Sequence, residues 1–269
     1  MTVLALLAAE PTPEPASDLP FPPEVEDFYL PALIDGLYPW ITKFTLLVWL
    51  AVALILIFFL LAYRNPRMVP GKAQWMAESI YGFARNNIAR ELIGVEGQRF
   101  APYLATLLCF ILVTNIFGIV PFIQISPNAH IAFPVVLAVI TYIMFNYVGI
   151  RKYGFVRYMK NSLILPAPWY VQPLLLPVEF FSTFFIRPFT LAVRLFANMF
   201  AGHVILLVFT LGGFVLLNID NFFIKPISLL SWAMAIALTF LEALIAILQA
   251  YVFVVLTSTY LQGALAEEH

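Results

Sequence analysis

The sequence FTLAVRLFANMFAGHVILLVF, residues 189–209, combines a strongly apolar composition with three polar side chains. The segment is long enough to cross the roughly 30 Å hydrocarbon core of a bilayer, yet it carries Arg194, Asn198 and His203. An arginine at that depth costs between ~3 and well over ~10 kcal/mol, depending on how far its side chain reaches toward water. No other positive charge lies within six residues of it, so it is not a membrane-edge anchor. We therefore expect Arg194 to be functional and to face a charged partner or a water-filled path.

The composition outside this segment is also that of a membrane protein. Of the 269 residues, 62% are hydrophobic and 11% are charged, whereas a soluble domain has about 25% charged residues. The chain lacks zinc-type Cys/His spacing, a phosphate-binding glycine loop and a basic–aromatic array, so we expect no metal, cofactor, nucleic acid or catalytic residue. Its single cysteine, Cys109, rules out an internal disulfide. The sequence therefore predicts an all-α, polytopic membrane protein.

An acidic, proline-rich segment, residues 1–37, precedes a single membrane domain, residues 38–269. Apolar runs of sufficient length predict three ordinary transmembrane helices, at about 41–62, 100–120 and 131–149. Residues 70–94 differ, because apolar side chains recur there at helical spacing between charged ones. This pattern is typical of an amphipathic helix on the membrane surface, with a solvated connector helix as the alternative.

The distribution of charge orients the chain. Ten of the fourteen basic residues lie in two blocks, Arg64–Arg99 and Arg151–Lys160, and seven of the fifteen acids lie between Glu10 and Asp35. Because positive residues flank the cytoplasmic side of a membrane, both basic blocks are predicted to be cytoplasmic and the acidic N-terminus extracytoplasmic. Alternate crossings agree, since they place the loop at 121–130 outside and the C-terminus in the cytoplasm.

Two apolar stretches, residues 178–217 and 222–261, are each forty residues long. A helix of that length measures about 60 Å, twice the hydrocarbon core, so each must tilt strongly or bend. Pro188 is the expected bend. Joined by a short turn, the two stretches predict a long tilted membrane hairpin that could wrap along a curved partner. The prolines of residues 163–177 predict an irregular membrane-edge or re-entrant connection before it.

The polar residues of this hairpin fall into register. At 100° per residue, Asn198 lies on the same face as Arg194, whereas His203 points about 180° away. On the second helix, Glu242 and Gln249 are seven residues apart and share one stripe. Antiparallel pairing would bring Glu242 toward His203, and Gln249 toward Arg194 or Asn198.

This arrangement suits proton transfer. Histidine titrates near neutral pH, and a buried carboxyl beside it can exchange protons with it through water. Arg194 cannot release its proton. It is therefore suited to being a fixed positive charge that attracts a carboxylate and separates two aqueous paths.

Structural interpretations compete with this one. Asn198 and Gln249 could simply hydrogen bond across helices, and His203 alone could equally be a packing residue. Glu179 and Arg187 are eight residues apart and share a face, so they could be anchors or a mutual ion pair rather than parts of a pathway.

The runs RLFANMFAGH at 194–203 and LEALIAILQAYVFVVL at 241–256 closely resemble subunit a of F-type ATP synthases. The resemblance implies that Arg194 is the essential arginine that faces an acidic residue of the rotating c-ring. It also implies that Asn198 and Gln249 are polar neighbours of that arginine. His203 and Glu242 match the pair that lines the proton inlet half-channel, and in some bacterial members these two positions hold the acid and the histidine in the opposite order.

Glu179 resembles an acidic residue near the cytoplasmic half-channel of that family. It stands fifteen residues before Arg194, one more than the spacing the resemblance predicts. An inserted residue turns a helix by about 100° unless a bulge absorbs it. Arg187 occupies a place where lysine or glutamine is expected.

The resemblance implies a non-catalytic subunit of the bacterial plasma membrane that conducts protons through two half-channels. Proton flow would turn the ring and drive ATP synthesis elsewhere in the complex. The implied partners are the c-ring, the subunit b peripheral stalk and the lipid bilayer. The sequence leaves both H⁺ and Na⁺ open, because the ring's own site decides much of that choice.

The alternative is a secondary transporter in which Arg194 binds an anionic substrate. Transporters of that kind commonly have inverted repeats and paired broken helices, and the sequence has neither. A purely structural membrane scaffold would leave Arg194 and the His203–Glu242 pair unexplained.

Overall fold

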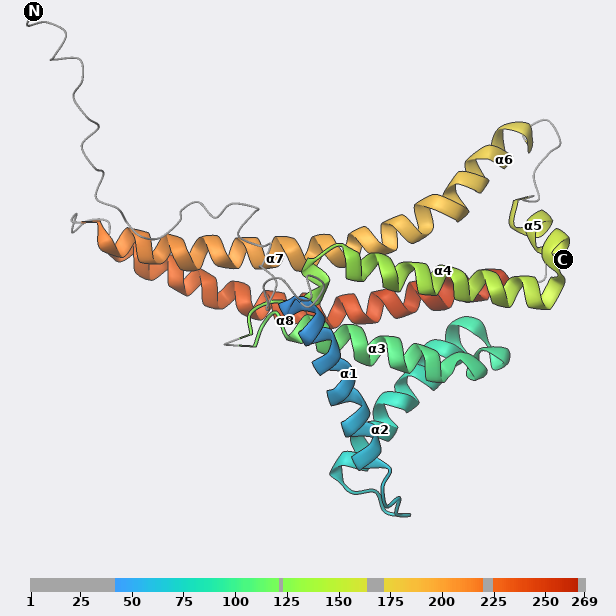
Figure 1. Cartoon of the computed structure of the whole chain (residues 1–269), viewed down its shortest axis with the longest axis horizontal. Coiled ribbons are helices and arrows are strands. Elements are labelled where there is room, and N and C mark those ends of the chain that lie inside the picture. Colours follow the sequence, from blue (N-terminus) through green and yellow to red (C-terminus); the bar gives the residue numbers. More distant parts are fainter. Residues whose placement is uncertain (1–41, 121–122, 164–171, 220–224, 266–269) are drawn as a thin grey trace, which may run out of the picture. The chain divides into compact units, whose positions relative to one another are not determined.

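The computed structural model describes residues 42–120, 123–163, 172–219 and 225–265 (Figure 1). The acidic segment predicted at 1–37 lies outside them, as do residues 164–171 and the hairpin turn at 220–224. Within the described residues, five helices are long and apolar enough to cross a membrane: Lys43–Ala62, Val95–Ile116, Ala132–Tyr153, Leu174–Asn218 and Lys225–Leu265. The prediction of an all-α, polytopic membrane protein is confirmed.

The elements follow one another along the chain as helices of three kinds. The α-helices are α1 (Lys43–Ala62), α2 (Lys72–Gly82), α3 (Ala101–Ile116), α4 (Ala132–Tyr153), α5 (Phe155–Leu163), α6 (Gln172–Phe181), α7 (Arg187–Asn218) and α8 (Lys225–Leu265). The π-helical segments are η2 (Phe83–Ile93) and η5 (Ser182–Ile186), and the 3₁₀ segments are η3 (Val95–Phe100) and η4 (Pro127–Ala129).

The described residues form two compact units. The larger comprises residues up to His203 together with Phe240–Leu265, and the smaller comprises the described parts of Val204–Thr239. Helices α7 and α8 contribute to both. Each unit is therefore described by itself.

The core of the larger unit lies where α3, α7 and α8 meet. Leu104 and Ile111 of α3, Leu195 of α7, and Phe253 and Val254 of α8 are fully buried members of one apolar cluster. By contrast, α1 leaves most of its large apolar side chains exposed, as a helix does when lipid covers it. The core thus fixes α7 against α8 from one side only.

In the smaller unit, the end of α7 and the start of α8 pair in antiparallel directions. The hydroxyl of Ser228 donates to the carbonyl oxygen of Gly213 at 2.7 Å, and that of Ser231 donates to the carbonyl oxygen of Phe209 at 2.7 Å. The indole of Trp232 lies directly against Gly213, where any larger side chain would clash. Small residues and hydroxyl-to-backbone bonds are how helices associate in membranes, where apolar burial gives little advantage.

The chain between α4 and α7 differs from the prediction. Residues 163–177 were expected to be irregular because of their prolines, but α6 begins at Gln172 and contains Pro177. Pro173 stands in the first turn of α6. Backbone N–H groups there have no partner within the helix, so a proline at this position removes no helical hydrogen bond. The long helical run of the hairpin therefore starts before residue 178.

Helix α5 was not predicted as an element. Gly154 separates it from α4 with a φ of +78°, a left-handed conformation that only glycine adopts readily. The ring of Tyr158 then packs directly on Gly149, and its hydroxyl donates to the Asn146 carbonyl oxygen at 3.1 Å. This contact between α4 and α5 depends on tertiary packing rather than on local periodicity.

Candidate functional site

Arg194 lies on an exposed face of α7. Its side chain is exposed and makes no hydrogen bond or ion pair with any other described residue. Ala197, Asn198 and Ala201 are also exposed and lie within one or two turns on the same side of the helix. We call these four side chains the Arg194 face. Its small residues leave room for another backbone to approach closely.

The opposite side of α7 is buried. Leu191, Ala192, Leu195 and Met199 have almost no exposed surface. The helix therefore turns its apolar side chains inward and presents its arginine outward, which is the reverse of what lipid favours. Such a face is stable in a membrane only if a charged or polar partner covers it or water reaches it.

Asn198 connects the Arg194 face to α8. Its Nδ2 donates a hydrogen bond of 2.8 Å to Oε1 of Gln249. Gln249 is only 4% exposed, and its Nε2 is buried with no partner among the described residues. The antiparallel pairing expected from the residue spacing therefore brings Gln249 to Asn198, one turn from Arg194.

Glu242 lies at the next contact along the same pair of helices. It is 6% exposed, and its Oε2 is buried without a hydrogen-bond partner among the described residues. A Cβ atom built on Gly202 would lie 3.3 Å from Oε1 of Glu242, so the carboxyl rests against the backbone of α7. Gly202 immediately precedes His203, which is half-buried. The structure thus brings Glu242 to the turn of α7 that carries His203.

Glu179 forms a separate site. Its Oε1 accepts hydrogen bonds from Nη2 of Arg187 and from Oγ1 of Thr183, both at 3.2 Å. The guanidinium of Arg187 also lies over the ring of Tyr260 of α8, 5.8 Å from its centre. Glu179 and Arg187 therefore form an ion pair, and a place for Glu179 in a proton pathway stays a prediction. Fifteen residues of helix separate Glu179 from Arg194 by about 22 Å, so the two do not form one cluster.

The π-helical segment η5 lies between Glu179 and Arg194. In it the N–H of Arg187 bonds to the carbonyl oxygen of Ser182, five residues earlier. A π-helical turn is how a helix accommodates one additional residue, and Pro188 removes a regular hydrogen bond just after it. Figure 1 shows the chain bending between α6 and α7, as expected at such a site.

A buried polar network escaped the sequence analysis. Asn128 donates from Nδ2 to Oδ1 of Asn115 at 2.7 Å and to Oγ1 of Thr114 at 2.8 Å. Asn115 in turn donates to the carbonyl oxygen of Ala246 at 3.2 Å. This carbonyl lies on α8 between Glu242 and Gln249. The loop after α3 therefore fixes the position of α8 along its axis, relative to α3, close to these two polar residues. The signal in the sequence was the Ser-Pro-Asn turn at 126–128, whose partners are set by tertiary structure.

The chain is similar to known proteins over most of its length. A family model described as ATP synthase A chain matches residues 45–262. The chain belongs to the ATP synthase subunit a family. An ATP synthase subunit a of Rhodococcus erythropolis is 43% identical over 251 residues, which cover 92% of this chain and 91% of the relative. One of Nocardioides sp. is 42% identical over 261 residues, covering 92% and 94%. One of Parafrankia sp. is 46% identical over 211 residues, covering 78% and 70%.

Membership in the ATP synthase subunit a family confirms the resemblance found in the sequence. The matched region contains the Arg194 face, Gln249, Glu242 and the Glu179–Arg187 pair. The chain is accordingly a multi-pass membrane subunit associated with ATP synthesis and ion transport. Membership favours this interpretation over the secondary transporter and the structural scaffold.

Proposed function

We propose that this ATP synthase subunit a conducts protons through the membrane sector and has no catalytic role of its own. Protons enter from the extracytoplasmic side of a bacterial plasma membrane past His203 and Glu242 and pass to a carboxylate of the c-ring. They leave to the cytoplasm on the far side of Arg194. The observation that carries the proposal is Arg194 itself, exposed within a membrane helix and unpaired among the described residues.

The electrostatics of Arg194 support this role. A guanidinium stays protonated at all physiological pH values, and it attracts a ring carboxylate that has just lost its proton. A protonated carboxyl gains much less from that position, so a ring site must discharge its proton before it passes. The membrane potential supplies about 2.3 kcal/mol per charge per 100 mV, and the arginine directs that energy into rotation rather than leakage.

Glu242 and His203 are proposed to form the inlet. The Oε2 of Glu242, which has no partner among the described residues, supports this, because such a buried oxygen is the kind of atom that water or a transferable proton satisfies. Asn198 and Gln249 are proposed to orient the region where the ring carboxylate approaches Arg194. Glu179 is proposed to belong to the outlet, where its ion pair with Arg187 holds the carboxylate in place.

The c-ring is the proposed occupant of the Arg194 face, and cysteine cross-linking tests this directly. In a Cys109→Ala background, Ala197→Cys should form disulfides with cysteines placed along the outer helix of the small ring subunit. Ala192→Cys is the matched control, because that alanine is buried on the other side of α7. Equal cross-linking from both positions, or none from Ala197→Cys, would show that the ring does not cover this face. The subunit b peripheral stalk is proposed to contact other surfaces.

Gly202→Ala is expected to slow proton pumping without preventing assembly. The added methyl group would meet Oε1 of Glu242 at 3.3 Å, closer than ordinary contact, and displace the carboxyl. Overpacking of this kind costs about 1–3 kcal/mol, so the rate of ATP-driven acidification should fall by roughly fivefold to a hundredfold. Gly263→Ala on α8 is the control, since nothing lies within 4 Å of its Cβ position. Unchanged pumping in Gly202→Ala would argue against a role for the Glu242 position.

A further inference from the structure

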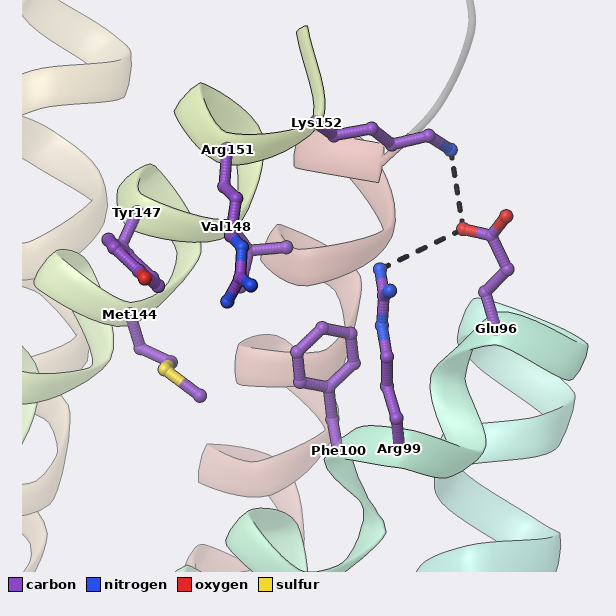
Figure 2. Close-up of a pocket in the computed structure, with 8 residues that line it drawn as sticks. All are labelled: Glu96, Arg99, Phe100, Met144, Tyr147, Val148, Arg151 and Lys152. Carbon is purple, nitrogen blue, oxygen red and sulfur yellow. Dashed lines mark hydrogen bonds and ion pairs between the residues drawn. The ribbon is translucent and has the colours of Figure 1, made fainter. Parts of the chain in front are cut away.

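A cavity of about 510 Å³ opens between η3 and the end of α4. Residues of η3 line one side and residues of α4 the other: Glu96, Arg99, Phe100, Met144, Tyr147, Val148, Arg151 and Lys152 (Figure 2). We call it the basic cavity. It lies far along the chain from the Arg194 face, and nothing in the proposed proton pathway uses it.

The basic cavity holds three cations and one carboxylate. Lys152 Nζ lies 3.3 Å from Oε2 of Glu96, and Arg99 Nη2 lies 3.9 Å from the same oxygen. Arg151 makes no ion pair within the described part of the chain. Figure 2 shows its guanidinium pointing into the space between α4 and η3, toward Arg99 and Phe100. One carboxylate therefore leaves a net positive cavity in which two guanidinium groups can bind an anion.

The cavity is continuous with an apolar stripe on α4. Val136, Ile140, Ile143 and Tyr147 are exposed, are spaced four, three and four residues apart, and so share one face. Arg151 continues the same face by one turn beyond Tyr147. From Val136 to Tyr147 the stripe is about 16 Å long, close to half of the roughly 30 Å hydrocarbon core. It therefore has the depth of one leaflet, with the basic cavity at its polar end.

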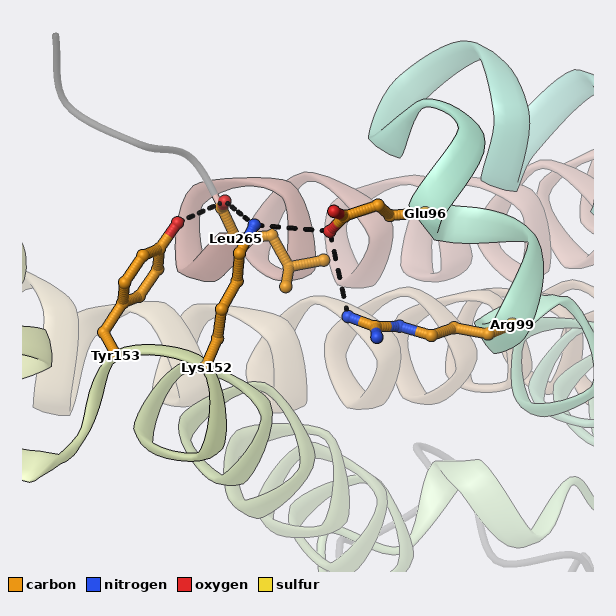
Figure 3. A network of polar contacts seen from close by, with 5 residues as sticks. All are labelled: Glu96, Arg99, Lys152, Tyr153 and Leu265. Atoms are coloured by element: carbon orange, nitrogen blue, oxygen red, sulfur yellow. Dashed lines mark hydrogen bonds and ion pairs between the residues drawn. The ribbon is translucent and has the colours of Figure 1, made fainter.

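The cavity also lies where three membrane helices end together. Lys152 Nζ and the hydroxyl of Tyr153 donate to the carbonyl oxygen of Leu265, at 3.1 and 2.8 Å (Figure 3). These bonds hold the last turn of α8 beside the end of α4, and Glu96 ties the start of the α3 span to the same lysine. A ligand in the basic cavity would bridge η3 and α4 beside the last turn of α8.

We propose that the basic cavity binds the phosphodiester head group of an anionic phospholipid. Arg99 and Arg151 hold the phosphate oxygens, and an acyl chain follows the stripe from Tyr147 to Val136. Arginine pairs with phosphate through two parallel hydrogen bonds. Basic pockets between membrane helices on the cytoplasmic side are suited to such head groups. A lipid accounts for the stripe as well as the charges, whereas a soluble anion or an acidic peptide accounts for the charges alone.

The test uses the assembled complex in nanodiscs of phosphatidylcholine that contain a minor fraction of phosphatidylglycerol. Native mass spectrometry measures the phosphatidylglycerol that stays bound to subunit a. Each basic residue near an anionic lipid contributes about fivefold to binding, so Arg99→Gln/Arg151→Gln should bind roughly thirtyfold more weakly. Arg64→Gln/Arg67→Gln is the matched control, with the same loss of charge on the same predicted side. It should retain lipid as the wild type does.

One further variant and one competition experiment identify the ligand. Arg151→Lys keeps the charge and should retain most of the lipid, which separates lost binding from lost folding. Inorganic phosphate at millimolar concentration should not displace the lipid, because it cannot occupy the apolar stripe. The proposal would be overturned if both double variants lost equal amounts of lipid, or if Arg99→Gln/Arg151→Gln, the pocket variant, kept all of its lipid. Displacement of the lipid by phosphate would also overturn it. So would loss of a protein subunit from the pocket variant with its lipid unchanged.

Discussion

Arg194→Ala is expected to abolish ATP-driven proton pumping while the complex stays assembled. The arginine is exposed on α7 and contributes nothing to the apolar core, so its removal should leave folding intact. Under the proposed function, the ring carboxylate that faces Arg194 would lose a strong counter-charge. Breaking a desolvated ion pair costs about 3–5 kcal/mol, which corresponds to a loss of at least about a hundredfold in rate. Acidification of inverted membrane vesicles, compared at equal amounts of assembled complex, measures the effect.

Two controls sharpen this result. Arg157→Ala removes an exposed cation from α5, away from the Arg194 face, and should pump normally. Arg194→Lys keeps a positive charge but lacks the planar geometry with which arginine makes two parallel hydrogen bonds. Its pumping rate should lie between those of Arg194→Ala and Arg157→Ala. Pumping by Arg194→Ala at close to the wild-type rate would refute the proposed electrostatic barrier.

Glu242→Gln is expected to reduce proton pumping by about a hundredfold, within the range by which a positioned acid–base group accelerates proton transfer. Glutamine has the same size, so the contact with Gly202 is preserved and assembly should be normal. The amide of glutamine, unlike the carboxyl of Glu242, cannot take up or release a proton at physiological pH. Glu91→Gln on η2 is the matched control, because that carboxylate is exposed and distant in the chain from the hairpin.

An exchange variant separates proton transfer from structure at the same position. If His203 and Glu242 work as a pair, His203→Glu/Glu242→His should pump better than either single variant, since the acid and the histidine have only traded helices. Acidification of inverted membrane vesicles measures pumping by Glu242→Gln, by the exchange variant and by the single variants. Wild-type pumping by Glu242→Gln, or an exchange variant no better than the single ones, would exclude the proposed inlet.

Much of the hairpin was predictable because helical periodicity is regular. The spacing along two antiparallel helices predicted that Gln249 approaches Arg194 or Asn198, and the structure has a 2.8 Å hydrogen bond between Gln249 and Asn198. Arg194 is exposed on α7, as expected from the free-energy cost of burying an arginine in an apolar helix, and the partner or water path that it needs stays a prediction. The same reasoning brought Glu242 to the turn of His203, where the structure has it against Gly202.

Other features depend on contacts that periodicity does not reveal. The prolines at 163–177 pointed to irregular structure, yet a proline in the first turn of α6 costs no hydrogen bond. Helix α5 depends on the contact between Tyr158 and Gly149. The link from Asn128 to Asn115 and Ala246 joins a loop to a helix more than one hundred residues away. The basic cavity likewise requires η3 and α4 to lie side by side.

The buried side of α7 has a mechanical consequence under the proposed function. A turning ring exerts torque on the subunit that holds still, and the force is applied at the Arg194 face. Leu191, Leu195 and Met199 transmit it inward, because they are buried and a close-packed interior is nearly incompressible. The network from Asn128 to the Ala246 carbonyl braces α8 against sliding along its axis. A stator built in this way yields little under strain, so little of the energy released by each proton is lost as elastic deformation of the protein.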